Sequence, residues 1–262
     1  MKVITSALYV SVILLFCFSD VYAGKIVGQL EPFARTTLKS QIEGEVQQIF
    51  FKTGDALEKG RQVIQIDKTD YTLEYKSALE NQNLSRINYD FSKTEYKRYE
   101  KLIKTRVVTT QLFDTQKNNY QNFKYKKNLA HIAVAQAKRK IEKTRVKVPY
   151  TASISARYVE VGDYVRIGDN LLEIVDLTRI KAVFFILPED YRSYTLGMEV
   201  RLTVPDLNEV GILGTVFSIA PTIIGADPGY RMEVLLDNKN YRLSPDFDVE
   251  LSTPSKEKKT HE

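Results

Sequence analysis

The sequence has few of the side chains on which catalysis and metal binding usually depend. Its 262 residues include one cysteine, two histidines and no tryptophan. His131 stands between Ala130 and Ile132, with no second histidine, cysteine or carboxylate cluster at ligand spacing, and His261 stands among the last residues. A lone histidine of this kind is more often structural or solvated than a metal ligand. We therefore predict no metal site and no bound cofactor.

Recognisable catalytic motifs are also lacking. The sequence contains no serine–histidine–aspartate arrangement, no phosphate-binding glycine loop and no nucleotide motif. The acidic pairs Glu43/Glu45 and Glu189/Asp190 are expected as exposed charges on a strand and at a helix start, and not as acid–base pairs. The sequence therefore predicts a protein that is not an enzyme.

The N-terminus has the pattern of a secretory signal. A short positive start precedes an apolar run over residues 3–18, and the residues up to Ala23 suit signal-peptidase cleavage before Gly24. A retained membrane anchor is the alternative, but the run is short for a full span. Bulky Phe16 disfavours lipidation of Cys17. We predict a cleaved signal peptide and a cysteine-free mature chain without disulfides in a bacterial periplasm.

Positive charge gathers between residues 70 and 147. This stretch has 18 Lys+Arg against 8 Asp+Glu, whereas the whole chain carries +5. A basic helical segment could bind nucleic acid, but the export signal argues against that partner. We interpret the charge as the solvated outer face of long helices, with electrostatic steering toward an acidic partner as the weaker alternative.

Residues 70–147 are predicted to form two long helices folded back on each other. Apolar residues recur at steps of three and four, which is the pattern of a coiled-coil seam. The expected seams are Leu73, Ser77, Leu84, Ile87, Phe91 and Thr94 in the first helix, and Gln116, Tyr120, Phe123, Ala130, Val134, Ala137 and Ile141 in the second. The numbers of facing residues are expected to sum to about 214. The turn then falls in the β-branched run 105–109, which makes a poor helix interior.

A short repeat flanks this hairpin on both sides. Gly54 and Gly60 in the first stretch match Gly162 and Gly168 in the second at a constant offset of 108 residues, and an aspartate follows the first glycine in each. Gly–Asp and Lys–Gly turns between short apolar runs indicate small strands. Each stretch alone has too few strands to bury its apolar face, so we expect the two to pair into one β-sandwich. This pairing would bring the roots of the two helices together.

Several short strands and one short helix follow the second half and indicate a small β-barrel. With the split sandwich and the inserted helical hairpin, the predicted fold class is α+β. The predicted order is a signal peptide (1–23), an N-terminal strand segment (24–41), the first sandwich half (42–69), the helical hairpin (70–147), the second half (148–177), the barrel (178–252) and a disordered tail (253–262).

Together these features resemble the periplasmic adaptor proteins, also called membrane fusion proteins or haemolysin-D-like proteins. The likeness rests on the two Gly–Asp stretches around a hairpin, on the signal peptide, and on Leu187-Pro188-Glu189, which is similar to the family's entry into its barrel. The resemblance implies a lipoyl-like sandwich with an inserted coiled-coil hairpin. It also implies a non-catalytic adaptor that forms a ring, a trimer or a hexamer, and bridges the two membranes in efflux or export.

The resemblance further implies partners and contact residues. The expected partners are an inner-membrane transporter of the resistance–nodulation–division or ABC type and a TolC-like outer-membrane channel, with the adaptor peripheral to the inner membrane. Family members that dock such channels carry an arginine, a leucine four residues later and a serine seven beyond that. Here Arg98, Leu102 and Thr109 match, with a methyl group added at the third position. The resemblance also implies that the four turn glycines of the repeat have a structural role and do not bind a ligand.

The chain also departs from the family pattern. Pro149-Tyr150-Thr151-Ala152 stands where the second half usually has Pro-Phe-x-Gly, and Pro245-Asp246-Phe247 stands where the last barrel strand usually starts with Pro-Gly-Met. Many members continue into a membrane-proximal domain built from both chain ends. That domain is expected to be missing here, which leaves the engagement of the transporter unexplained.

Two other functions remain open from the sequence. Lipoyl and biotin carriers bear a modified lysine after the first half, and Lys68 lies near that place. A long helix is expected to begin there, however, so no tight hairpin would present the lysine. The second alternative is a structural coiled-coil protein of the envelope with no role in transport.

Overall fold

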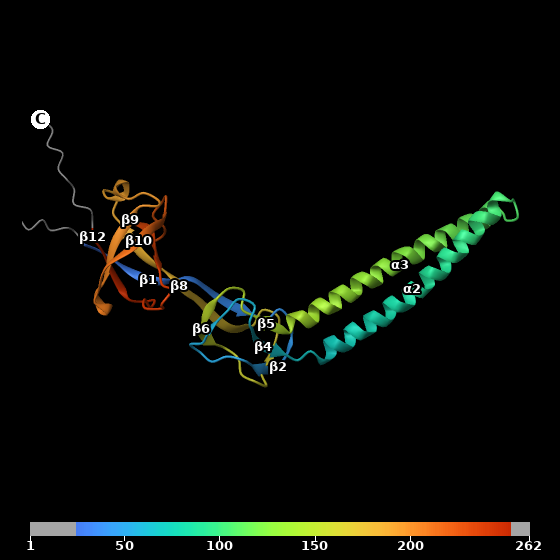
Figure 1. Ribbon diagram of the computed structural model, residues 1–262, viewed down its shortest axis with the longest axis horizontal. Coiled ribbons are helices and arrows are strands. Elements are labelled where there is room, and N and C mark those ends of the chain that lie inside the picture. Colours follow the sequence, from blue (N-terminus) through green and yellow to red (C-terminus); the bar gives the residue numbers. More distant parts are fainter. Residues whose placement is uncertain (1–24, 253–262) are drawn as a thin grey trace, which may run out of the picture. The chain divides into compact units, whose positions relative to one another are not determined.

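The computed structural model describes residues 25–252, which fold into two compact units (Figure 1). One unit holds residues 35–176, and the other holds residues 25–34 and 177–252. Strands and two long helices occur together, in agreement with the predicted α+β class. The expected signal peptide, its cleavage site at Ala23 and Gly24, and the expected tail lie outside the described residues.

The elements follow one another in the order β1 (Lys25–Lys39), β2 (Gly44–Ile49), β3 (Ala56–Leu57), β4 (Gln62–Ile66), α2 (Thr69–Lys104), α3 (Thr110–Lys143), β5 (Arg145–Lys147), β6 (Ala152–Arg157), β7 (Tyr164–Val165), β8 (Asn170–Ile186), η1 (Tyr191–Ser193), β9 (Glu199–Val204), η2 (Pro205–Leu207), β10 (Glu209–Ile219), β11 (Tyr230–Asp237) and β12 (Asp248–Ser252).

The two repeat stretches build one split β-domain by completing each other's strands. Four backbone amides donate to carbonyls of the opposite half: Gly54 to Ile154 and Gly162 to Val46 (both 2.9 Å), Gly60 to Val148 (2.8 Å) and Gly168 to Ser40 (2.9 Å). Donors and acceptors alike are offset by the 108 residues seen in the sequence. All four glycines have φ between 85° and 98°, which few other residues adopt easily. Because each half supplies hydrogen bonds that the other lacks, the halves depend on each other.

The core of the split β-domain is drawn from both halves. Its fully buried side chains are Val46, Val63, Ile64, Ile66, Leu171, Leu172 and Ile174. β4 pairs with β2 on one side and with β5, directly after α3, on the other. β5 and the end of β4 therefore hold the roots of the two helices next to each other.

The second unit is a β-barrel. Its strands run in the order β1-β12-β9-β10-β11-β8, and β1 also pairs with β8, which closes the sheet. Residues 25–29 of the N-terminal strand pair with 248–252 of β12, so the barrel includes chain from both sides of the split β-domain. The strand passes very close to β8 at Gly28, where a Cβ atom would lie 2.2 Å from the Val183 carbonyl oxygen.

The helices α2 and α3 lie antiparallel and side by side (Figure 1). Lys104 ends α2, and Thr109 caps α3, whose first residue is Thr110. Between them Arg106 has φ 57°, a left-handed conformation that reverses the chain. The turn therefore lies in the β-branched run at which the sequence placed it. At the root, the Asp67 carboxylate accepts from the Thr69 amide (3.0 Å) and hydroxyl (2.8 Å), and these bonds hold the pKa of Asp67 below its ordinary value.

The predicted seam of the first helix is wrong. Leu84, Ile87 and Phe91 were expected against the second helix, but they are 58, 61 and 68% exposed. The inner face of α2 is instead a row of half-buried and buried residues at alternating steps of three and four, namely Tyr71, Tyr75, Ala78, Gln82, Ser85, Tyr89, Ser92, Tyr96, Tyr99 and Ile103. Two helices alone cover a large side chain only in part, so tyrosines suit this face because their rings pack while their hydroxyls reach water.

The inner face of α3 follows the prediction. Ala130 and Ala137 are buried, and Tyr120, Phe123 and Val134 are half-buried. Contacts across the hairpin include Gln82 with His131, Glu74 with Lys140, Tyr96 with Phe113, and Tyr89 and Tyr96 with Tyr120. The residue numbers in these pairs sum to between 209 and 216, around the expected value, although all four α2 residues involved differ from the predicted seam residues.

Candidate docking site at the hairpin tip

Stacked aromatic rings support the outer third of the hairpin. The ring of Tyr96 stacks on that of Tyr120 with centroids 5.1 Å apart and lies 5.9 Å from that of Phe113, and the ring of Tyr89 lies 5.7 Å from that of Tyr120. The Lys127 ammonium sits over the Tyr89 ring at 4.2 Å. A hydrogen bond with Tyr89 raises the pKa of Tyr120. These contacts join α2 to α3 close to the turn, so the tip is presented on a braced pair of helices.

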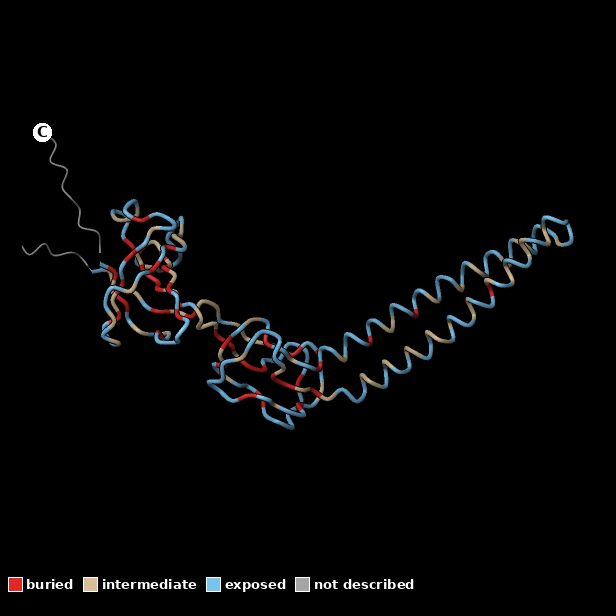
Figure 2. Tube along the Cα trace, in the orientation of Figure 1, coloured by how far each residue is buried: buried red, intermediate tan, exposed pale blue. Residues whose placement is uncertain are grey.

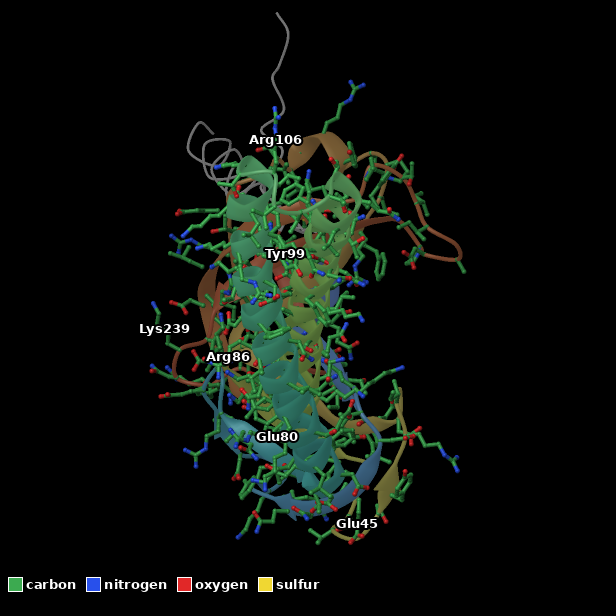
Figure 3. All side chains as sticks on the ribbon, turned by 90° about the vertical axis from the view of Figure 1, so that its right-hand side faces the viewer. Glu45, Glu80, Arg86, Tyr99, Arg106 and Lys239 are labelled. Atoms are coloured by element: carbon green, nitrogen blue, oxygen red, sulfur yellow. The ribbon has the colours of Figure 1, made fainter. Side chains whose placement is uncertain are left out.

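The structure places the three predicted docking residues around this tip. Arg98 lies in the last two turns of α2, is exposed, pairs with Glu95 and stacks its guanidinium 5.5 Å from the Tyr99 ring. Leu102 is half-buried one turn further along. Thr109 follows the turn. Figure 3 labels Tyr99 and Arg106 at this end of the hairpin.

Thr109 has a role within the hairpin. Its hydroxyl oxygen accepts the Leu112 amide at 3.3 Å, which satisfies one of the free amides at the start of α3. A serine could do the same, because the bond uses only the hydroxyl oxygen. The hydroxyl therefore stabilises the start of α3, whatever it does toward a partner.

Two further residues at the tip were not singled out from the sequence. Val107 is 67% exposed within the turn, and Leu112 is exposed on the first turn of α3. Together with Leu102 and Arg98 they make the tip a small surface of aliphatic side chains beside a cation. For Val107 the signal was available in the sequence, because an apolar residue inside a predicted turn has no core to enter.

The remaining candidate residues lie elsewhere. Lys68 stands immediately before α2 and not in a tight hairpin turn. The Nδ1 atom of His131 lies 2.9 Å from the Gln82 amide nitrogen on the hairpin surface. Within residues 25–252 no group of three or more histidine, cysteine, aspartate or glutamate side chains could hold a metal ion.

The chain thus combines a split β-domain, an inserted helical hairpin and a small barrel, and this combination can be compared with known protein families. The family model described as the barrel-sandwich hybrid domain of the RND membrane fusion proteins matches residues 34–177. This match covers more than half of the chain, so the chain belongs to the membrane fusion protein family.

Curated relatives share this assignment. The multidrug resistance protein MdtA of Erwinia amylovora is 26% identical over 216 residues, which cover 80% of this chain and 53% of MdtA. The protein of the same name from Yersinia enterocolitica is 25% identical over 58% of this chain and 35% of its own length. The chain thus spans about half the length, or less, of these relatives.

Solved structures share the fold at low identity. The membrane fusion protein Spr0693 of Streptococcus pneumoniae has a TM-score of 0.70 at 12% identity, covering 89% of this chain and 99% of that one. A MacA–MexA chimera that contains the Pseudomonas aeruginosa MexA α-hairpin has a TM-score of 0.64 at 19% identity, covering 88% of this chain and 79% of that one. In the part of the chain that the structure describes, no helix is long and apolar enough to cross a membrane.

Proposed function

We propose that the protein is a non-enzymatic periplasmic adaptor of a tripartite efflux or export system. It forms a ring of identical copies, a trimer or a hexamer, peripheral to the inner membrane. The split β-domain acts as a lipoyl-like module within the ring, and the hairpin acts as a coiled-coil arm. The barrel faces an inner-membrane transporter, and the hairpin tip contacts a TolC-like outer-membrane channel. Energy comes from the transporter.

The observation that carries this proposal is the braced tip. Arg98, Leu102 and Thr109 lie within the last turns of a long hairpin whose rings stack across both helices, and Val107 and Leu112 add exposed apolar surface beside them. A cation next to aliphatic side chains suits the ends of partner helices, whose carbonyl groups carry partial negative charge. Each contact is small, so a ring of copies supplies the affinity through multivalency.

Substitution of the docking arginine tests the proposal. We expect Arg98→Asp to reduce export and the co-purification of the outer-membrane channel at least tenfold, because the new carboxylate faces partial negative charge at the partner. Arg86→Asp is the matched control, since Arg86 is an exposed arginine of the same helix that lies nearer the root (Figure 3). Equal loss in both variants, or none in Arg98→Asp, would contradict docking through the tip.

A further inference from the structure

A groove lined by positive charge lies at the root of the hairpin, within the unit that holds residues 35–176. Its volume is about 360 Å³, and its walls come from the end of β1, the last turns of α3 and the strand β5, which directly follows α3 (Figure 1). Five cations and one carboxylate line it, namely Lys39, Arg139, Lys143, Arg145, Lys147 and Glu142. A groove of this size can hold a small ligand.

The five cations of the groove have no acidic partners. Within residues 25–252 none of them forms an ion pair, and Glu142 forms none there either, although the neighbouring Lys140 pairs with Glu74 at 2.7 Å. Cations that lie close together repel one another, and an anion bound between them offsets this repulsion. The groove therefore attracts anions.

The strands give the groove an apolar floor beneath its charges. Arg145 and Lys147 are exposed on β5, and Val146 between them is half-buried against the core of the split β-domain, because side chains alternate along a strand. Leu38 packs against the same core beside the exposed Lys39. The sheet thus fixes where the charges stand, and only the ends of the side chains are free to adjust to a ligand.

Two ordinary roles account for some of these cations but not for all. Lys143 lies in the last turn of α3, where a cation stabilises the partial negative charge of the helix end. Arg145 and Lys147 lie on an edge strand, where charged side chains discourage pairing with another sheet. Neither role explains Lys39, or Arg139 one turn before Lys143, and neither requires the cations to line one groove.

We propose that this groove binds phosphate groups with at least two negative charges in total, in a free phosphate compound or in the headgroup of an anionic lipid. The oxygens of a phosphate point in tetrahedral directions, so cations that come from β1, α3 and β5 suit it better than they suit a planar carboxylate. The guanidinium groups of Arg139 and Arg145 can each donate two hydrogen bonds to phosphate oxygens. This binding goes beyond the proposed function and does not depend on it.

Calorimetric titration of the purified protein tests the proposal with defined probes. Pyrophosphate represents a free phosphate compound, and cardiolipin in micelles of an uncharged detergent represents a headgroup with two phosphates. Phosphatidylcholine in the same micelles controls for binding to the micelle, and hexaglutamate controls for attraction of any polyanion. Binding of pyrophosphate alone would identify a free phosphate compound as the ligand, whereas tighter binding of cardiolipin would identify a lipid headgroup.

Two double variants remove charge from different walls of the groove. Arg145→Gln with Lys147→Gln changes β5, and Lys39→Gln with Lys143→Gln changes β1 and the end of α3. Glutamine keeps a polar side chain at each exposed position, so the fold should be retained, and thermal unfolding of each variant checks this. If one variant fails to fold, the other still tests the groove.

The matched control is Lys117→Gln with Lys124→Gln, two exposed lysines on the part of α3 away from the root, where the hairpin is exposed along most of its length (Figure 2). All three double variants lose the same net charge, so only a local site separates them. We expect each groove variant to weaken binding of the phosphate probe at least about tenfold, and the control to change it less than about twofold.

Four outcomes would overturn the proposal. They are equal weakening in the control variant, unchanged binding in the folded groove variants, hexaglutamate binding as tight as that of the phosphate probes, and a lack of binding by both phosphate probes beyond that of phosphatidylcholine micelles. Tight binding of hexaglutamate would indicate an acidic peptide as the ligand instead.

Discussion

Thr109 belongs to the predicted docking triple and is also the N-cap residue of α3. The cap uses the hydroxyl oxygen as an acceptor for the Leu112 amide, and the methyl group takes no part in that bond. A substitution can therefore remove the cap, or it can remove only the methyl group. The two changes distinguish stability of the tip from recognition by a partner.

We predict that Thr109→Ala destabilises the start of α3 by about 1 kcal/mol, because the first amides of the helix lose their side-chain acceptor. Hydrogen exchange of the amides of residues 110–113 measures the effect. Thr109→Ser is the control and should exchange like the native chain, since the hydroxyl remains. Faster exchange in the serine variant would contradict a cap made by the hydroxyl alone.

The packing of α2 against α3 in the outer part of the hairpin relies on aromatic rings more than on aliphatic side chains. Tyr96 contacts both Tyr120 and Phe113 and so joins two turns of α3 to one residue of α2. Toward the root, the inner face of α2 alternates tyrosines with small or polar residues such as Ser85 and Ser92, and the ring contacts across the hairpin involve Tyr89 and Tyr96. The outer third of the hairpin is therefore the part most sensitive to loss of one aromatic side chain.

We predict that Tyr96→Ala opens the outer third of the hairpin and leaves the root folded. The loss should be at least about 1 kcal/mol, since an aromatic pair contributes about 0.5–1.5 kcal/mol beyond its buried area. Hydrogen exchange along α2 and α3 locates the change. Tyr125→Ala removes a ring of the same kind from an exposed position of α3 and should leave exchange near the tip unchanged. An equal effect of both substitutions would refute the role of the stacked rings.

The sequence predicted the existence, direction and turn of the hairpin, and it predicted one of the two inner faces. It failed on α2 because Leu84, Ile87 and Phe91 recur with the same period as a true seam and are more apolar than Tyr89, Ser92 and Tyr96. Periodicity identifies a stripe but does not say what covers it. The apolar stripe and the inner face lie on different sides of one helix, and only the contacts across the hairpin distinguish them.

The split β-domain was easier to predict. Glycines at matching positions mark backbone conformations that other residues avoid, and an offset repeated over several residues is hard to produce by chance. The predicted tip residues were also placed near the turn, because the β-branched run 105–109 interrupts the helix. Val107 and Leu112 were not predicted, because neither residue belongs to the triple that the family resemblance implies.

At the scale of the whole molecule, residues 25–252 form two separate hydrophobic cores. One lies in the split β-domain, and the other lies in the barrel around Phe184, Leu202, Met232 and Val234. Residues 25–34 complete the barrel from the far end of the sequence. A change in this short strand should therefore damage the barrel selectively.

We predict that Gly28→Val destabilises the barrel by at least about 1–3 kcal/mol, because its Cβ would collide with the Val183 carbonyl and, at 2.5 Å, with the Phe184 ring. Hydrogen exchange should rise in β8, β11 and β12 but not in β4. Val27→Ala, at an exposed neighbouring position, serves as the control. Equal loss of protection in β4 would show that the two cores unfold as one.

The two halves of the split β-domain hydrogen-bond to each other, and the hairpin is inserted between them. The length of the hairpin is therefore independent of the β-domain that holds its root. The bonds Gly54 to Ile154 and Gly162 to Val46 do not involve the helices, whose inner faces repeat every seven residues. Adding or removing seven residues in each helix, at level positions, would change the arm by about 10 Å and leave both its ends as they are. The span of the hairpin can thus change, in evolution or by engineering, in fixed increments of seven residues per helix while its base and its tip stay the same.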